Sequence, residues 1–189
     1  MSLELFHQND QTGAFEATKG SDGRQNVSSR SDDRIYYISR DFSEAYSIVY
    51  QDATAAAGTI ILNCVNDAND LALVVHSVGF NAIQRTTLEL IETTGVPTGG
   101  SVITPFCLNR VTVHTAQCTV RGNDALGVVT SSGEFDHAQV EAGGHEEFRI
   151  RDSIRIGPGG SFGLNVETTV SAGIVEGVIF IYFEKLKSS

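Results

Sequence analysis

The sequence predicts an all-β protein: an antiparallel β-sandwich, jelly-roll-like, with an extended N-terminal arm. Three observations lead to this prediction. From Ile35 onward, short runs of branched and aromatic residues recur at intervals of about 8 to 15 residues. Clusters of Gly, Pro and Asn separate these runs and are typical of turns. No helical repeat persists over the length that a βαβ unit requires, so a sandwich is favoured over an α/β fold.

The first predicted strands are short and apolar. Residues 60–65 (IILNCV) and 71–78 (LALVVHSV) are rich in branched side chains, and the polar cluster at 66–70 predicts a tight turn between them. In residues 83–93, apolar and polar side chains alternate with the period of two that a half-buried strand shows. The Gly- and Pro-rich residues 95–100 then predict the next turn.

The second half of the chain continues the β pattern. Residues 111–120 (VTVHTAQCTV) alternate well, and residues 153–156 and 162–168 flank a Gly-Pro-Gly-Gly turn. Residues 174–184 (IVEGVIFIYFE) form the strongest predicted strand, and because both of its faces are apolar we expect it to be central and buried on both sides. Shorter candidates are residues 125–130, 134–140 and 147–150.

Residues 41–53 fit two structures. Asp41 and Glu44 have the spacing of a helix capping box, and apolar residues follow at helical spacing. However, Tyr46 and Tyr50 also belong to a strand-like alternation, and aromatic and branched residues favour strands. We favour the strand because the surrounding sequence is β.

Residues 1–34 differ in composition from the predicted β domain, residues 35–189. They are rich in Ser, Asp, Asn, Gln, Gly and Arg, and their few apolar residues follow no sustained period. Such a segment cannot offset its ordering entropy by burial within itself, so we expect it to be mobile or to gain order against a partner.

Arginines and tyrosines gather where the predicted arm meets the β domain. Both residue types are enriched in the cores of protein interfaces, so we predict that these side chains bind a partner. The alternative is that the arginines are solvated and that the tyrosines belong to the core. The predicted partner-binding residues are Arg24, Arg30, Arg34, Tyr36, Tyr37 and Arg40.

Composition excludes several functions. The formal net charge is −10, whereas a nucleic-acid-binding protein needs clustered cations, so no nucleic-acid partner is expected. The longest apolar runs are far shorter than the roughly 20 residues that span a bilayer, and the N-terminal residues do not resemble a secretion signal, so no membrane partner is expected either. The three cysteines, Cys64, Cys107 and Cys118, have no metal-ligand or disulfide pattern and are expected to be buried free thiols.

The only cluster that resembles a catalytic site contains His137, Glu141 and His145. Their spacing of four would place them on one face of a helix and could hold a metal, but Gly143 and Gly144 interrupt such a helix. A cupin-like metalloenzyme would need an HxH pair, which the sequence lacks. We therefore expect no catalytic residue, cofactor or metal and keep the metalloenzyme as the weakest alternative.

Several segments together carry a family resemblance. Over residues 24–184 the chain resembles small jelly-roll proteins of the cement or decoration type in tailed-phage virions. The segments are VSSRSDDRIYYISRD at 27–41, EAYS at 44–47, DATAAAG at 52–58, GG at 99–100, TP at 104–105, LNR at 108–110 and the IGPGG turn at 156–160 with the final strand to residue 183.

The resemblance implies a structural function rather than a catalytic one. Proteins of this family are commonly trimeric, sit on phage heads and bridge capsomers. It therefore implies a homotrimer that binds the major capsid protein on the surface of the virion head, after synthesis in the host cytoplasm. In this reading the N-terminal arm is the tether and the sandwich is a rigid body.

A second functional hypothesis is a tail- or fibre-associated jelly-roll module that recognises a receptor or carbohydrate. It would use exposed aromatic side chains in loops, and the candidates are Phe80, Phe106 and Phe135.

Overall fold

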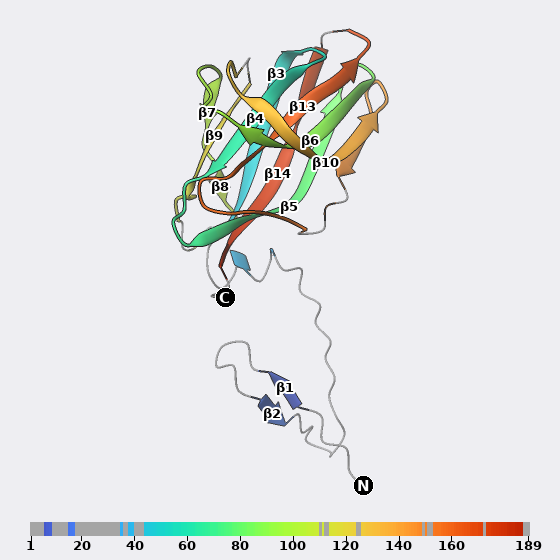
Figure 1. Ribbon diagram of the computed structural model, residues 1–189. Helices are drawn as coiled ribbons and strands as arrows, with labels where there is room; N and C mark the ends of the chain where they lie inside the picture. Colours follow the sequence, from blue (N-terminus) through green and yellow to red (C-terminus); the bar gives the residue numbers. More distant parts are fainter. Residues whose placement is uncertain are drawn as a thin grey trace, which may run out of the picture. The chain divides into compact units, whose positions relative to one another are not determined.

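The structure is a computed structural model of the full chain (Figure 1). The chain divides into two units, Met1–Asp32 and Asp33–Ser189. The residues that the structure describes are 6–8, 15–17, 35, 38–39, 44–109, 111, 114–123, 126–148, 150, 153–171 and 173–186.

In the first unit, the described residues form a small antiparallel pair. Strand β1 (Phe6–Gln8) pairs with β2 (Phe15–Ala17), with Phe6 opposite Ala17. The sequence does not predict these strands, because three-residue segments are too short to show a period.

The second unit is a sandwich of two antiparallel sheets, which confirms the predicted fold class. The β13 sheet has the order β10-β6-β13-β4-β9-β7, and the β14 sheet has the order β11-β5-β14-β3-β8, with β12 also paired to β5. The strands of the β13 sheet are β4 (Thr59–Asn66), β6 (Thr86–Thr94), β7 (Ser101–Ile103), β9 (Cys118–Gly122), β10 (Thr130–Val140) and β13 (Ser161–Thr169). Those of the β14 sheet are β3 (Ala45–Ala55), β5 (Leu71–Ala82), β8 (Phe106–Cys107), β11 (His145–Phe148), β12 (Ile154–Ile156) and β14 (Gly173–Lys185).

The strand order is that of a jelly roll. Strands β3, β4, β5 and β6 alternate between the two sheets, and β10, β11, β13 and β14 return in the same way. The last strand, β14, therefore lies between β3 and β5, and β13 lies between β4 and β6. This nested pairing is the double Greek key that defines the jelly roll.

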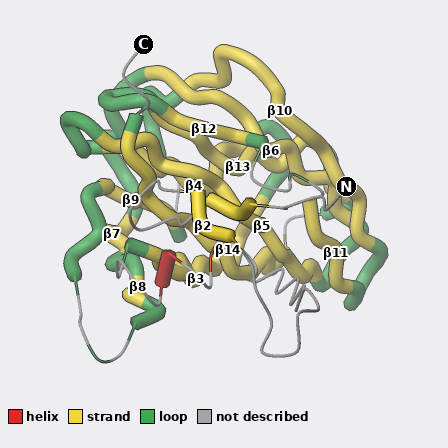
Figure 2. The backbone as a smooth tube through the Cα atoms, turned by 90° about the horizontal axis from the view of Figure 1, so that it is seen from below, coloured by secondary structure: helices red, strands yellow, loops and turns green. Residues whose placement is uncertain are grey.

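The long connection between β6 and β10 extends both sheets at one edge. Strands β9 and β7 add to β4, and β8 adds to the beginning of β3. The inserted strands lie at the edge opposite β10 and β11 (Figures 1 and 2). Strand β4 is therefore covered, and β3 is covered in part, at positions where unpaired backbone groups would invite pairing with other chains.

Two strand predictions in this region are wrong. The predicted strand at 111–120 is reduced to β9, since the described residues before Cys118 are not in a strand. The backbone N–H of Val111 donates to Asn109 Oδ1 (2.9 Å), a local turn that competes with strand pairing, and Val111 is 95% exposed. Residues 126–129 are likewise not a strand, and the chain pairs again only from Thr130, where β10 begins.

The main core lies between the sheets. Its largest fully buried side chains include Tyr46, Tyr50, Phe80 and Phe162, and Tyr46 makes an edge-to-face contact with Phe183 at 5.9 Å between ring centroids. In β3, buried and exposed positions alternate, so the favoured strand is confirmed over the helix from residue 45 onward. Asp41, Phe42 and Ser43 lie outside the described residues.

None of the three cysteines forms a disulfide, as predicted. Cys64 and Cys107 are buried in the main core, but Cys118 is partly exposed, so the prediction that all three are buried is wrong for Cys118. Desolvation by burial raises the pKa of the Cys64 thiol well above its usual value, which makes this sulfur a poor nucleophile.

A second, smaller core covers part of the outer face of the β14 sheet. Ile35 and Ile38 are buried with Ala45, Val74 and Tyr182. Ile35, Ile38 and Ser39 have helical backbone, so the prediction that the β pattern begins at Ile35 is wrong at these residues (Figure 2). In a helix, side chains spaced i, i+3 lie on one side, and both isoleucines are buried in this core. Asn109 Nδ2 donates to the Ser39 carbonyl (3.0 Å).

Strand β14 is central, as predicted, but its outer face is only partly buried. Tyr182 is fully buried under the second core, while Glu176 is exposed and Val178 is partly exposed. Beyond the second core, the residues that the structure describes leave the outer face of the β14 sheet open.

Candidate functional site

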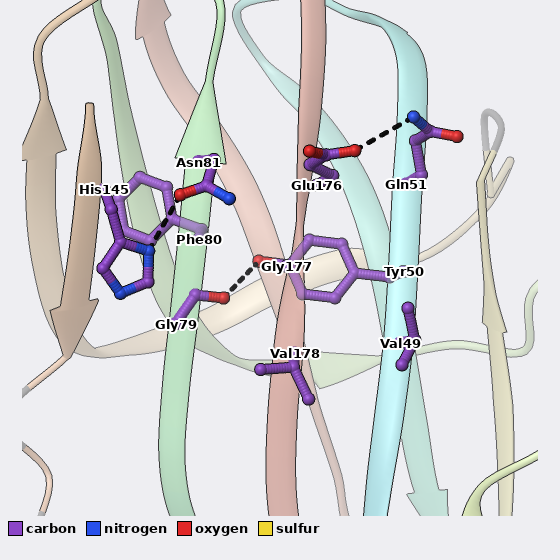
Figure 3. A pocket seen from close by; sticks show the side chains of 10 residues that line it. All are labelled: Val49, Tyr50, Gln51, Gly79, Phe80, Asn81, His145, Glu176, Gly177 and Val178. Carbon is purple, nitrogen blue, oxygen red and sulfur yellow. Dashed lines mark hydrogen bonds between the residues drawn. The ribbon is translucent and has the colours of Figure 1, made fainter. Parts of the chain in front are cut away.

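An open hollow of about 350 Å³ lies on the outer face of the β14 sheet (Figure 3). Strands β3, β5, β11 and β14 contribute its lining residues, so the hollow is built on paired strands of the sheet. Its ten lining residues are Val49, Tyr50, Gln51, Gly79, Phe80, Asn81, His145, Glu176, Gly177 and Val178.

Four polar side chains form one row across this hollow. His145 lies opposite Asn81, Asn81 opposite Glu176, and Glu176 opposite Gln51. Two hydrogen bonds fix the row in pairs. His145 Nδ1–H donates to Asn81 Oδ1 (2.8 Å), and Gln51 Nε2 donates to Glu176 Oε2 (3.1 Å).

Two glycines shape the floor of the hollow. A Cβ on Gly79 would lie 3.2 Å from Cε1 of His145, so the bare backbone lets the imidazole ring lie close to the sheet. On the core side, a Cβ on Gly177 would lie 2.1 Å from the Gly79 carbonyl oxygen and 2.7 Å from the Tyr50 hydroxyl. The Tyr50 hydroxyl donates to that same carbonyl (3.5 Å), and burial raises the pKa of Tyr50 far above its usual value.

Apolar side chains form the next row. Val178 lies opposite Gly79 on one side and opposite Val49 on the other, and Val49 is 67% exposed. The hollow thus combines a polar row with an adjacent apolar strip.

The side chains that line the hollow are mainly hydrogen-bonding amides and apolar groups. Glu176 is the only carboxylate among the ten lining residues, and none of the ten is Lys, Arg, Ser, Thr or Cys. Tyr50 carries the only hydroxyl of the lining, and that group is buried and donates to the Gly79 carbonyl. The lining therefore presents no exposed hydroxyl, thiol or amine nucleophile to pair with His145 as a base. What it offers are fixed hydrogen-bond donors and acceptors.

The six predicted partner-binding residues of the arm lie outside the described residues. They are Arg24, Arg30, Arg34, Tyr36, Tyr37 and Arg40. Their neighbours Ile35 and Ile38 are described and are buried against the β14 sheet.

The structure does not bring together the three candidate metal ligands. His137 Nδ1 lies 2.8 Å from Glu134 Oε1, and this hydrogen bond raises the pKa of His137. Glu141 Oε1 lies 3.5 Å from Nε of Arg85 and forms an ion pair with it. His145 is hydrogen-bonded through Nδ1 to Asn81 Oδ1. In the part of the chain that the structure describes, no group of three or more His, Cys, Asp or Glu side chains could hold a metal ion. The metal site considered from the sequence is therefore wrong, because its spacing of four belongs to a helix and these residues form strands and a turn.

The proposed aromatic surface is also wrong in part. Phe80 is not an exposed loop residue, because it is fully buried in β5 and packs against Phe148. Phe106 and Phe135 are 54% and 41% exposed, but they belong to β8 and β10, which lie at opposite edges of the sandwich. These aromatic side chains do not form one surface.

Sequence reasoning singled out His145 but missed its partners in the polar row. Gln51 and Glu176 occupy outward positions of alternating strands, which is a signal the sequence does contain. However, the row exists only because of the register between four strands that are far apart in the chain, and the sequence does not specify this register.

Comparison with known proteins finds no match to a family model, a curated protein or a solved structure. In the described part of the chain, no helix has the length and hydropathy of a membrane span.

Proposed function

We propose that this protein is a phage virion structural protein, a cement or decoration subunit that binds the assembled head and stabilises it. One observation carries the proposal. Ile35 and Ile38, which directly follow the arm, are buried on Tyr182 and Val74 of β14 and β5. The chain immediately after the arm is therefore held on the central strands of the sandwich, as a tether requires.

The sandwich fits the role of a structural subunit. The inserted strands cover β4 and the beginning of β3. The net charge of −10 keeps separate subunits soluble before they bind to the head. Jelly rolls occur widely in viral capsid domains, and this agrees with the resemblance over residues 24–184.

In this proposal the arm contacts the major capsid protein, and the subunit acts as a homotrimer on the surface of the head. Arg24, Arg30, Arg34 and Arg40 supply charge-assisted hydrogen bonds, and Tyr36 and Tyr37 supply contact area. Stabilisation follows by mass action, because the subunit binds only the assembled shell.

The test is binding to capsids assembled without this protein. Replacing the four arginines of residues 24–40 by Gln in the full chain is expected to lower occupancy at least tenfold, and so is deletion of residues 1–34. The matched control is Arg85→Gln, which removes an exposed arginine from the body and should bind like wild type. Undiminished occupancy of the deletion variant would refute the tether.

A further inference from the structure

We propose that the hollow on the outer face of the β14 sheet is a binding site for a neutral saccharide. This site is independent of the arm and goes beyond the cement function. Three properties of the hollow favour such a ligand: its mixture of donors and acceptors, its apolar strip and its preformed geometry.

The polar row presents donors and acceptors side by side. Asn81 Oδ1 accepts from His145, so both N–H groups of the Asn81 amide are left for a ligand; no described side chain accepts from them. Figure 3 shows this amide nitrogen turned toward β14. Next to it, the Glu176 carboxylate accepts from Gln51 and has further lone pairs. In the neutral His145 ring, a protonated Nδ1 leaves Nε2 as an acceptor.

This mixture matches hydroxyl groups better than charged groups. A hydroxyl both donates and accepts, so neighbouring hydroxyls satisfy Glu176 and Asn81 together. A guanidinium or ammonium group has donors only and would face the Asn81 N–H groups. An acidic ligand would be repelled by Glu176, and the ten lining residues provide no Lys or Arg to compensate.

The apolar strip suits the other side of a sugar ring. Val178 and Val49 lie one row away from the polar side chains, on the same face of the sheet. The C–H groups of a sugar would cover these valines while its hydroxyls reach the polar row. A volume of about 350 Å³ lies at the lower end of the range for small-molecule sites, roughly 300–1,000 Å³, and favours one or two sugar units in an open cleft.

The site is preformed. All four polar side chains lie on strands, and each takes part in a hydrogen bond within the row. Binding therefore costs little ordering of side chains.

The test begins with the full-length protein on an array of neutral and acidic glycans, followed by calorimetric titration of the glycans that bind. We expect binding to neutral glycans. Glu176→Gln and Asn81→Ala are each expected to lower the affinity tenfold or more, since each removes a hydrogen-bonding group that the ligand uses.

The opposite sheet offers a matched control. Asn165 Nδ2 donates to Glu89 Oε2 (2.7 Å) across β13 and β6, an amide–carboxylate pair like that of Gln51 and Glu176. Glu89→Gln should leave the affinity unchanged, and thermal unfolding should show that all variants are folded.

Three outcomes would overturn the proposal. They are silence on every neutral glycan, binding that Glu176→Gln and Asn81→Ala both leave intact, and binding of a short arginine-containing peptide in place of any glycan. None of these outcomes bears on occupancy of capsids, so the two proposals fail separately.

Discussion

The second core gives the sharpest quantitative prediction. Ile38 is only 6% exposed and packs with Ile35, Val74 and Tyr182 outside the main core. Ile38→Ala removes three carbon groups, and at about 0.8 kcal/mol for each buried group this corresponds to about 2.4 kcal/mol. Since the site lies at the surface and can partly collapse, the loss should stay near the lower end of the range of about 2–5 kcal/mol for such substitutions.

The assay is unfolding by urea at equilibrium. We expect the midpoint for Ile38→Ala to fall by an amount that corresponds to about 2–3 kcal/mol, with an unchanged dependence on urea. The control is Val111→Ala, because Val111 is 95% exposed and its truncation should change stability by less than about 0.5 kcal/mol. If Ile38→Ala had an effect as small as that of Val111→Ala, Ile38 would not be packed on the β14 sheet. The chain after the arm would then not be anchored there.

Two further predictions concern single positions. Gly177→Ala should lower the free energy of unfolding by about 3 kcal/mol or more, because its Cβ would lie 2.1 Å from the Gly79 carbonyl oxygen. The control is Gly157→Ala, whose Cβ would meet nothing within 4 Å. Similar melting temperatures for the two variants would contradict the close packing at Gly177. The hydrogen bond that His137 donates to Glu134 raises the pKa of this exposed imidazole, so any stabilisation from the protonated ring is present at acid pH and is lost as the pH rises through the folded-state pKa. In an NMR titration, Glu134→Gln should lower the pKa of His137, and an unchanged value would refute this cause.

Much of the sandwich is predictable from local pattern, because the alternation of buried and exposed residues is a property of each strand alone. Strands β4, β5, β13 and β14 lie where their apolar runs predict them, and β3 is a strand because Tyr46, Ile48 and Tyr50 all face the core. Propensity and burial agree at these positions, so the prediction is reliable there.

The parts that were missed depend on contacts between distant residues. Strand β8 is only two residues long and exists because Cys107 lies opposite Tyr46. In the same way, Ile35 and Ile38 have helical backbone and are buried where Tyr182 and Val74 offer an apolar surface. No local pattern records these partners.

The hollow illustrates the same limit at the candidate site. Its polar row needs His145, Asn81, Glu176 and Gln51 to fall into register across four strands, and its floor needs Gly79 at the adjacent position. A shift of one residue in any strand would turn that side chain toward the core. On a helix, the sequence spacing would have placed His145 beside two other candidate metal ligands, whereas the observed register gives this residue an amide partner.

The central claim is that the arm gains its order from a partner molecule while the sandwich stays unchanged. Hydrogen exchange of the full chain, free and bound to capsids, measures this directly. The account predicts that amides in residues 18–34 become strongly protected on the capsid, with little change in β4, β13 and β14. Equal protection of residues 18–34 in the free subunit would contradict the proposal that the arm gains its order on the capsid, because this segment would then already be ordered within the subunit.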